Sequence, residues 1–392
     1  MKIISHVKLR GFFPMGIFGC WVPMVLFLSL LLTGPNAAEC KQAIKIAAIY
    51  ALSGAGAEAN APCLRGVRLA VDEINGTGGV LGLPFELIEI DNRSTPIGSK
   101  VAAVQAVKHE VTAIIGAAFS SHSIAVARVA QRNGIPMITN VSTSPPVTRI
   151  GDCIFRVCFN DLQQGEVMGK FAREQLQAES VVAVFNVASD YSMGLIKTFE
   201  KAFVKRGGVM QAKIPYKKQQ PHFRNIIDQA KSLRPDVLFI PGHDESARIV
   251  VEALQKELNA IPLGGDGWDV QSFYNMGGNL IKLGYYTTHW NPVVESAPSK
   301  KFVARYHQSG TILTATALGY DAVHLLADAI ERAGTVDRSK IRAALARTRG
   351  FEGVTGTISF DNYGDPVKSV VIMKIQDGRP VYFKQITPGD KH

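Results

Sequence analysis

The chain has 392 residues, of which 46% are hydrophobic and 19% are charged, a composition that argues against disorder and predicts two or three folded domains. Its formal net charge is +10. The Lys and Arg residues are scattered, and they form no helix-turn-helix or aromatic–basic motif, so we expect no nucleic-acid partner.

The N-terminus has the pattern of a secretory signal peptide. Lys2, Lys8 and Arg10 form a basic start, an uncharged stretch runs from Gly11 to Leu32, and small residues precede Ala38. We therefore expect residues 1–38 to be cleaved and the mature chain to be periplasmic. An uncleaved anchor is the alternative, since about 20 apolar residues span a bilayer. A lipid anchor on Cys40 is disfavoured because Glu39 stands where a small residue is expected.

From Ile44 onwards, short apolar runs alternate with amphipathic stretches. The runs predict strands at 44–50, 85–90, 113–116 and 136–139, and the stretches predict helices at 64–74, 101–107 and 124–132. We place the start of the first helix after Pro62. Strands that alternate with helices predict a parallel sheet covered by helices.

The same alternation restarts after Asp161. It predicts strands at 181–185, 209–214, 237–240, 262–264 and 282–290, and helices at 194–206, 223–232 and 245–258. Three further helices are expected at 299–308, 315–333 and 338–347, and the chain ends in strands at 356–360, 369–375 and 381–383.

These patterns predict an α/β fold of two doubly wound parallel-sheet lobes. No Gly/Ser linker separates them, so we expect short crossings near 159–162, 290–293 and 355–361. The lobes are then 43–158 plus 292–356, and 159–291 plus 357–386. Several crossings form a hinge that allows opening and closing.

Ligands of open α/β sheets bind at the carboxyl ends of the strands. Ser120-Ser121, Ser142-Thr143, Tyr191, Asp266 and Trp268 lie in such loops. Hydroxyls and helix N-termini suit a carboxylate, and an acid suits an ammonium. Each residue also has a structural interpretation: the serines and Asp266 as helix caps, Ser142-Thr143 as a turn, and the aromatics as core.

Enzymatic signatures are weak. Gly54 and Gly56 resemble a dinucleotide-binding loop, but Asp91 lies 37 residues after Gly54 rather than about 20. We find no nucleophile elbow, Walker loop or paired-carboxylate signature. We therefore expect no enzymatic activity and no cofactor.

The cysteines give no metal signature. Neither a Cys-x-x-Cys pair nor a His-rich spacing is present, so we expect no metal. After cleavage Cys40, Cys63, Cys153 and Cys158 remain. Residues 154–157 are predicted to be extended, so a bridge between Cys153 and Cys158 would need a sharp bend. The pairing stays open.

An ordered set of stretches resembles one family. They are 52–54, 65–66 with 70–75, 78–82, 115–116 with 120–121, 155–156, 190–194, 265–269 and 319–322. From about Ile44 to Phe383 the chain is similar to the periplasmic leucine/isoleucine/valine-binding proteins of ABC importers, which have the type I periplasmic binding fold. The resemblance implies a monomer that closes around an amino acid of aliphatic or branched-chain type and delivers it to a membrane permease.

The resemblance also implies roles for individual residues. The loops at Ser120-Ser121 and Ser142-Thr143 would hold the ligand carboxylate, and Asp266 would hold the ammonium. Tyr191, Gly242 and His243 would line the second lobe. The loop at 56–60 lacks the aromatic residue of some members, which favours a wider or more polar pocket. Two alternatives stay open: a sensor for another small carboxylate or amide, and an exported NAD-dependent enzyme.

Overall fold

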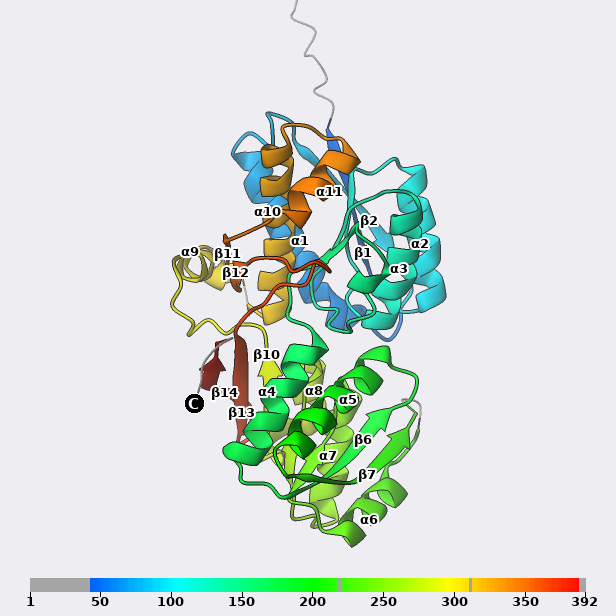
Figure 1. Cartoon of the computed structure of the whole chain (residues 1–392), viewed down its shortest axis with the longest axis vertical. Helices are drawn as coiled ribbons and strands as arrows, with labels where there is room; N and C mark the ends of the chain where they lie inside the picture. Colours follow the sequence, from blue (N-terminus) through cyan, green and yellow to red (C-terminus); the bar gives the residue numbers. More distant parts are fainter. Residues whose placement is uncertain (1–42, 218–219, 310–311, 388–392) are drawn as a thin grey trace, which may run out of the picture. The chain divides into compact units, whose positions relative to one another are not determined.

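Two sheets, one in each half of the chain, organise the protein (Figure 1). The computed structural model describes residues 43–217, 220–309 and 312–387. The predicted signal peptide and Cys40 lie outside these residues. Within them, no helix is long and apolar enough to cross a membrane.

The first sheet has five parallel strands in the order β2-β1-β3-β4-β5. The strands are β1 (Ile44–Tyr50), β2 (Phe85–Asp91), β3 (Ala113–Gly116), β4 (Met137–Thr139) and β5 (Ile154–Arg156). Helices α2 (Pro96–Lys108) and α3 (Ser120–Arg132) cover one face, and α1 (Ala57–Gly76), α10 (Thr314–Ala333) and α11 (Arg338–Ala346) cover the other (Figure 1).

Side chains of β1 alternate between these two layers. Ile46 and Ala48 pack in the core beneath α1 and α10, whereas Ala47 and Ile49 pack beneath α2 and α3. Successive residues of a strand point to opposite faces. Because both faces are covered, the strand is a continuous apolar run.

The second sheet has seven strands in the order β14-β13-β10-β9-β8-β6-β7. The parallel strands are β6 (Ser180–Asn186), β7 (Val209–Tyr216), β8 (Val237–Phe239), β9 (Ile261–Leu263) and β10 (Leu283–Thr288). The antiparallel strands β13 (Val370–Gln376) and β14 (Arg379–Ile386) extend one edge. The sheet is therefore parallel with an antiparallel edge.

Helices cover both faces of the second sheet. Helices α4 (Asp161–Glu174) and α5 (Asp190–Lys205) contribute to one core, and α6 (Arg224–Leu233), α7 (Glu245–Gln255) and α8 (Gln271–Gly277) contribute to the other. The remaining elements are α9 (Ala297–Tyr306), the hairpin β11 (Phe351–Gly353) and β12 (Gly356–Ile358), and four 3₁₀ turns: η1 (Thr148–Ile150), η2 (Asp266–Trp268), η3 (Gly278–Leu280) and η4 (His307–Ser309).

Our prediction that the first helix starts after Pro62 is wrong, because α1 begins at Ala57. The Asn60 side chain donates to the Gly56 carbonyl and accepts from the Ala51 amide, which fastens the first turn. Pro62 lies in the second turn, where it removes a single backbone hydrogen bond.

The sequence analysis also missed α4 and α8. The buried face of α4 includes Gln164, Gly165 and Gly169, so it gives little apolar periodicity. A Cβ at Gly165 would overlap Thr198, and one at Gly169 would overlap Ala202. Small residues allow α4 to pack closely on α5, and hydrophobicity patterns do not detect such a contact.

The chain passes between the two sheets three times: between β5 and α4, after β10, and between Phe360 and Val370. The last passage lies later than the expected 355–361. A buried ion pair joins the first passage to the third, because Arg156 Nε lies 2.6 Å from Asp365 Oδ1 and both side chains are at least 95% buried.

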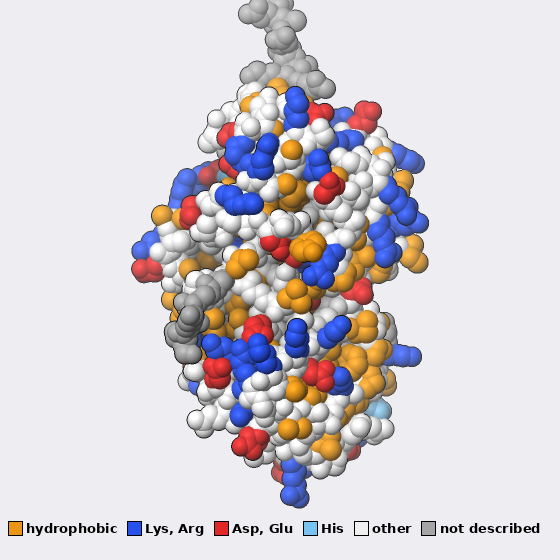
Figure 2. Space-filling view, viewed as in Figure 1, with side chains coloured by type: hydrophobic (Ala, Val, Ile, Leu, Met, Phe, Trp, Pro, Cys, Tyr) orange, Lys and Arg blue, Asp and Glu red, His pale blue; other side chains and the backbone are white. Residues whose placement is uncertain are grey.

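Charged side chains are dispersed over the surface. On the face that Figure 2 shows, Lys and Arg side chains lie over both sheets and are interspersed with acidic and hydrophobic groups. This face has no single basic stripe of the kind that nucleic-acid-binding proteins use.

Candidate functional site

A small cavity lies where the carboxyl ends of the two sheets meet. Its volume is about 60 Å³. The first sheet and its helices contribute Ala59, Cys63, Ala118, Phe119, Val141, Thr314 and Ala315, and the second contributes His243, Asp266, Gly267, Asp269, Val270 and His289. Its position is the one expected for ligands of open α/β sheets.

Asp266 is the main charged group of this cavity. It begins η2, directly after β9, and its amide donates to Gln164 Oε1 at 2.8 Å. Its Oδ2 lies 3.1 Å from His289 Nε2, whereas its Oδ1 is buried without a hydrogen-bond partner. Burial acts to raise the pKa of Asp266. The hydrogen bond and the charge of His289 together outweigh that effect, so the pKa of Asp266 falls below its usual value. Asp266 is thus an ionised carboxylate with one oxygen still to be satisfied.

A row of aromatic rings closes one side of the cavity. The Tyr191 ring stacks on His243 with centroids 5.0 Å apart, and His243 meets Phe119 at 4.9 Å. The Tyr191 hydroxyl accepts a hydrogen bond from the Gly267 amide at 3.1 Å. Phe119 directly precedes α3, which packs on the first sheet, whereas His243 lies in the β8–α7 loop and Tyr191 in α5 of the second sheet. The row therefore connects the two sheets beside the cavity.

Gly242 lies behind this row and does not line the cavity. A Cβ at this position would lie 2.5 Å from both the Tyr216 hydroxyl and Ser246 Oγ. Glycine therefore allows the loop that presents His243 to pass close to these side chains.

The predicted hydroxyl loops lie next to the cavity, but their hydroxyls do not line it. Ser142 Oγ lies 2.7 Å from the Ala118 carbonyl and 2.6 Å from Ser123 Oγ, and Ser120 Oγ accepts from the Ser144 amide. Thr143 is buried, and its carbonyl accepts from the Asp161 amide. Ser142 and Ser120 thus fasten the two loops to each other, and Thr143 fastens its loop to the start of α4.

The start of α3, at Ser120-Ser121, is open toward a ligand in a different way. This helix has no side-chain cap, so the amides of its first turn lack the partner that a cap supplies. Unpaired amides at a helix N-terminus form a site for a carboxylate. Ser120 and Ser121 thus offer backbone N–H groups rather than hydroxyls.

Trp268 belongs to the core rather than to the cavity wall. It is fully buried, its Nε1 donates to the Ile240 carbonyl at 3.1 Å, and its ring stacks on Phe273. It holds η2 against the second sheet and so positions Asp266.

The sequence analysis missed Phe119, Asp269 and His289 as lining residues. His289 directly follows the carboxyl end of β10, but the strand predicted at 282–290 extended past it, so the rule that selected the other loops did not select it. Its ring meets Phe159 at a tilt of 38°, with centroids 3.7 Å apart. Asp269 accepts a hydrogen bond from Thr288 Oγ1 at 2.5 Å, and burial raises its pKa.

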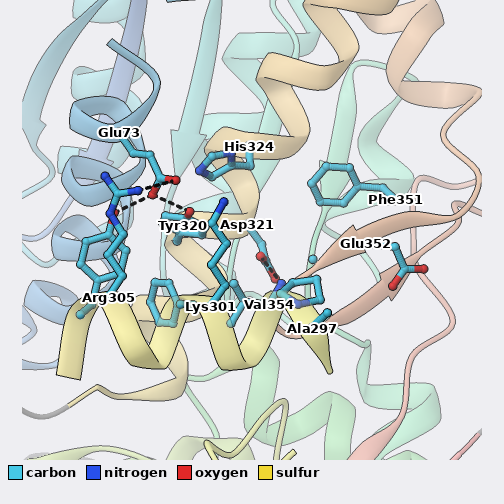
Figure 3. Close-up of a pocket in the computed structure, with 14 residues that line it drawn as sticks. Glu73, Ala297, Lys301, Arg305, Tyr320, Asp321, His324, Phe351, Glu352 and Val354 are labelled. Carbon is cyan, nitrogen blue, oxygen red and sulfur yellow. Dashed lines mark hydrogen bonds and ion pairs between the residues drawn. The ribbon is translucent and has the colours of Figure 1, made fainter. Parts of the chain in front are cut away.

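A larger cavity of about 390 Å³ lies elsewhere, between α1, α9, α10 and β11 (Figure 3). Its acidic groups are already paired: Glu73 accepts from the hydroxyls of Tyr306 and Tyr320 and pairs with Arg305. Asp321 accepts from the amides of 354 and 355. The larger cavity also lies away from the carboxyl ends of the parallel strands, so the smaller cavity is the better candidate site.

Cys63 lines the cavity, but as a buried thiol whose raised pKa keeps it neutral. Cys63, Cys153 and Cys158 are buried and unbridged, and burial raises the pKa of Cys63 to about 12. Among the described residues no group of three or more His, Cys, Asp or Glu side chains is arranged to hold a metal ion.

Comparison with known proteins places this site in a family context. A family model described as "periplasmic binding protein" matches residues 43–380. A Leu/Ile/Val-binding protein homolog of Brucella melitensis is 28% identical over 345 residues, which are 86% of this chain and 93% of that protein. A leucine-, isoleucine-, valine-, threonine- and alanine-binding protein of Pseudomonas aeruginosa is 28% identical over 87% of this chain and 92% of its own length.

Solved structures of amino-acid-binding proteins are also similar to this chain. The leucine-binding protein LivK of Thermotoga maritima has a TM-score of 0.85 and 36% identity, with 88% of this chain and 99% of that chain covered. The branched-chain amino acid transporter substrate-binding protein LivJ of Streptococcus pneumoniae, in complex with isoleucine, has a TM-score of 0.83 and 30% identity, over 88% and 100% of the two chains.

Proposed function

Since the chain belongs to the periplasmic binding protein family, we propose that it captures one amino acid between its two sheets and delivers it to the permease of an ABC transporter. The main support is the unpartnered Oδ1 of Asp266. A buried anionic oxygen without a donor is costly unless a ligand pairs with it, and an α-ammonium provides a charged donor.

The opposite end of the ligand suits the first sheet. The uncapped N-terminus of α3 faces the same region through Phe119, which lines the cavity. A carboxylate at the amides of Ser120 and Ser121, and an ammonium at Asp266, would place a zwitterion across the gap between the two sheets. Neither sheet alone provides both groups.

We further propose that the two sheets belong to two lobes that open and close. In this proposal the passages between β5 and α4, after β10 and after Phe360 form the hinge, and we keep the predicted division into lobes but move its last boundary to the passage after Phe360. The contact between Phe119 and His243 across the cavity supports assigning the present arrangement to a closed state. A ligand that bridges the sheets would select this state.

The proposal also includes export to the periplasm and binding without catalysis. The basic start and apolar run of the N-terminus support export. The relatives named above are binding proteins rather than enzymes. N-terminal sequencing of protein from the periplasmic fraction should begin near Glu39, and mass spectrometry should recover the ligand unchanged after incubation.

Calorimetry of Asp266→Asn against a panel of L-amino acids tests the binding role. The variant keeps the shape of the side chain but removes the charge, so we expect affinity to fall by about 2–5 kcal/mol, the usual cost of breaking one buried charged pair. Asp228→Asn makes the same change of charge on the surface of α6 and should bind normally.

If Asp266→Asn binds amino acids as tightly as the unchanged protein, Asp266 does not hold the ammonium. If no amino acid binds the unchanged protein but carboxylates without an ammonium do, the ligand is another small acid.

A further inference from the structure

We propose that Asp269 makes this site selective for a small hydroxylated amino acid, threonine or serine, over leucine, isoleucine and valine. The inference rests on the proposed function of the site. It concerns a residue that lies opposite the ligand's side chain rather than the groups that hold its ammonium and carboxylate.

Local geometry places Asp269 beside Asp266. Asp266 is the first residue of the 3₁₀ turn η2, and Asp269, three positions later, directly follows the turn. In a 3₁₀ turn, side chains three residues apart point to the same side. Both carboxyl groups line the cavity, whereas Trp268 between them is turned into the core.

The two carboxyl groups differ in their partners. Asp266 pairs with His289 and is held ionised, which suits an ammonium. Asp269 instead faces hydroxyl groups: Thr288 Oγ1 lies 2.5 Å from its Oδ2, and Thr314 Oγ1 lies 3.0 Å from Thr288 Oγ1. Burial raises the pKa of Asp269 above its usual value, although the hydrogen bonds with Thr288 and Thr314 act to lower it.

The hydrogens of the neighbouring hydroxyls are already used. Thr288 donates to Asp269 Oδ2, and Thr314 donates to the Trp290 carbonyl at 2.8 Å. Each hydroxyl supplies one hydrogen, so neither threonine can also donate to the second oxygen of Asp269. That oxygen is an acceptor at the cavity, for which a ligand hydroxyl is the matching donor.

The cavity is small, about 60 Å³, which favours a small side chain but does not separate threonine from valine. Phe119 and His243 close one side, which leaves little room for a leucine side chain. An aliphatic side chain that did enter would leave the Asp269 acceptor buried without a donor.

Threonine and valine provide the sharpest test, because they have nearly the same shape and differ by a hydroxyl in place of a methyl group. Calorimetry on the full mature chain should give threonine an affinity at least tenfold higher than valine, and up to about a hundredfold higher, the range expected for one buried hydrogen bond.

Two variants separate Asp269 from the rest of the site. Asp269→Asn keeps a neutral acceptor and should keep the preference for threonine. Asp269→Leu keeps the approximate shape but removes the acceptor, so the threonine-to-valine ratio should fall to about one or invert. Asp228→Leu, a matched change on the exposed surface of α6, should leave the ratio unchanged.

Valine or leucine binding to the unchanged protein as tightly as threonine overturns this specificity, and leaves the amino-acid site standing. An unchanged ratio in Asp269→Leu also overturns it. If Asp269→Leu does not fold, the threonine-to-valine ratio of affinities in the unchanged protein and in Asp269→Asn decides. Loss of the preference for threonine in Asp269→Asn contradicts a neutral acceptor at this position. If no amino acid binds at all, the proposed function fails together with this inference.

Discussion

Asp365 offers a direct test of how the passages between the two sheets are held together. Its carboxylate pairs with Arg156, whose side chain is fully buried, and accepts from Thr148 Oγ1 and Asn160 Nδ2, each at 2.8 Å. Asp365→Ala removes these acceptors and leaves the Arg156 charge buried without a counter-ion. Breaking one partner of a buried pair costs about 3–5 kcal/mol.

The loss should extend to the ligand loops. Arg156 also donates to the carbonyls of Ser142 and Ser144, so its displacement would disturb the loop beside α3. We expect Asp365→Ala to lower the free energy of unfolding by about 3–5 kcal/mol, which for a chain of this length corresponds to a fall in Tm of roughly 4–7 °C.

Chemical denaturation and calorimetry of the ligand-free protein measure this effect. Asp328→Ala is the matched control, because Asp328 pairs with Arg332 on the surface at a similar distance of 2.8 Å, with both side chains more than a third exposed. Surface pairs contribute about 0–1 kcal/mol. If the two variants lose equal stability, burial does not make the Arg156–Asp365 pair special, and our reasoning is refuted.

Three further predictions concern stability. Gly66→Ala should lower the free energy of unfolding by about 1–3 kcal/mol in denaturant titrations, because a Cβ would overlap the Thr316 carbonyl where α1 crosses α10. Gly76→Ala is the control in the same helix. A Cβ at Gly76 meets open space, so this change should be neutral or stabilising by up to about 1 kcal/mol. Burial, and then His243, lower the pKa of His122 to about 4 from 6.5, so the unfolded chain binds more protons between these values and stability should fall as pH falls through them. His122→Phe should flatten that part of the stability–pH curve, and an unchanged curve would contradict the assignment. Burial lowers the pKa of Lys368 from 10.5 to about 8, so stability should rise with pH from about 8 to about 10.5, and Lys368→Met should abolish the rise.

The elements that local rules specify were predictable from the sequence. Residues 44–50 and 113–116 are continuous apolar runs of strand length, and both form buried parallel strands. Helices α10 and α11 begin and end within one residue of their predicted bounds. The position of Asp266 at the candidate site also follows a local rule, because the carboxyl ends of parallel strands meet at one edge of a sheet.

Other features depended on packing between helices. Helix α4 escaped prediction because Gly165 and Gly169 bury their face against α5 through small size rather than hydrophobicity. The start of α1 depended on Asn60, whose side chain bonds to the backbone on either side of the turn. Neither contact leaves an apolar period in the sequence.

The sequence by itself determined the order of strands and helices and the loops that reach the candidate site, because backbone preferences and the alternation of buried side chains act over a few residues. Only the tertiary structure decided which side chains of those loops face the cavity. It turned Trp268 into the core and Asp266 outward, and it brought His289 to Asp266 and Phe119 to His243. These pairs come from segments far apart along the chain, and they meet because the two sheets present their carboxyl ends to the same space.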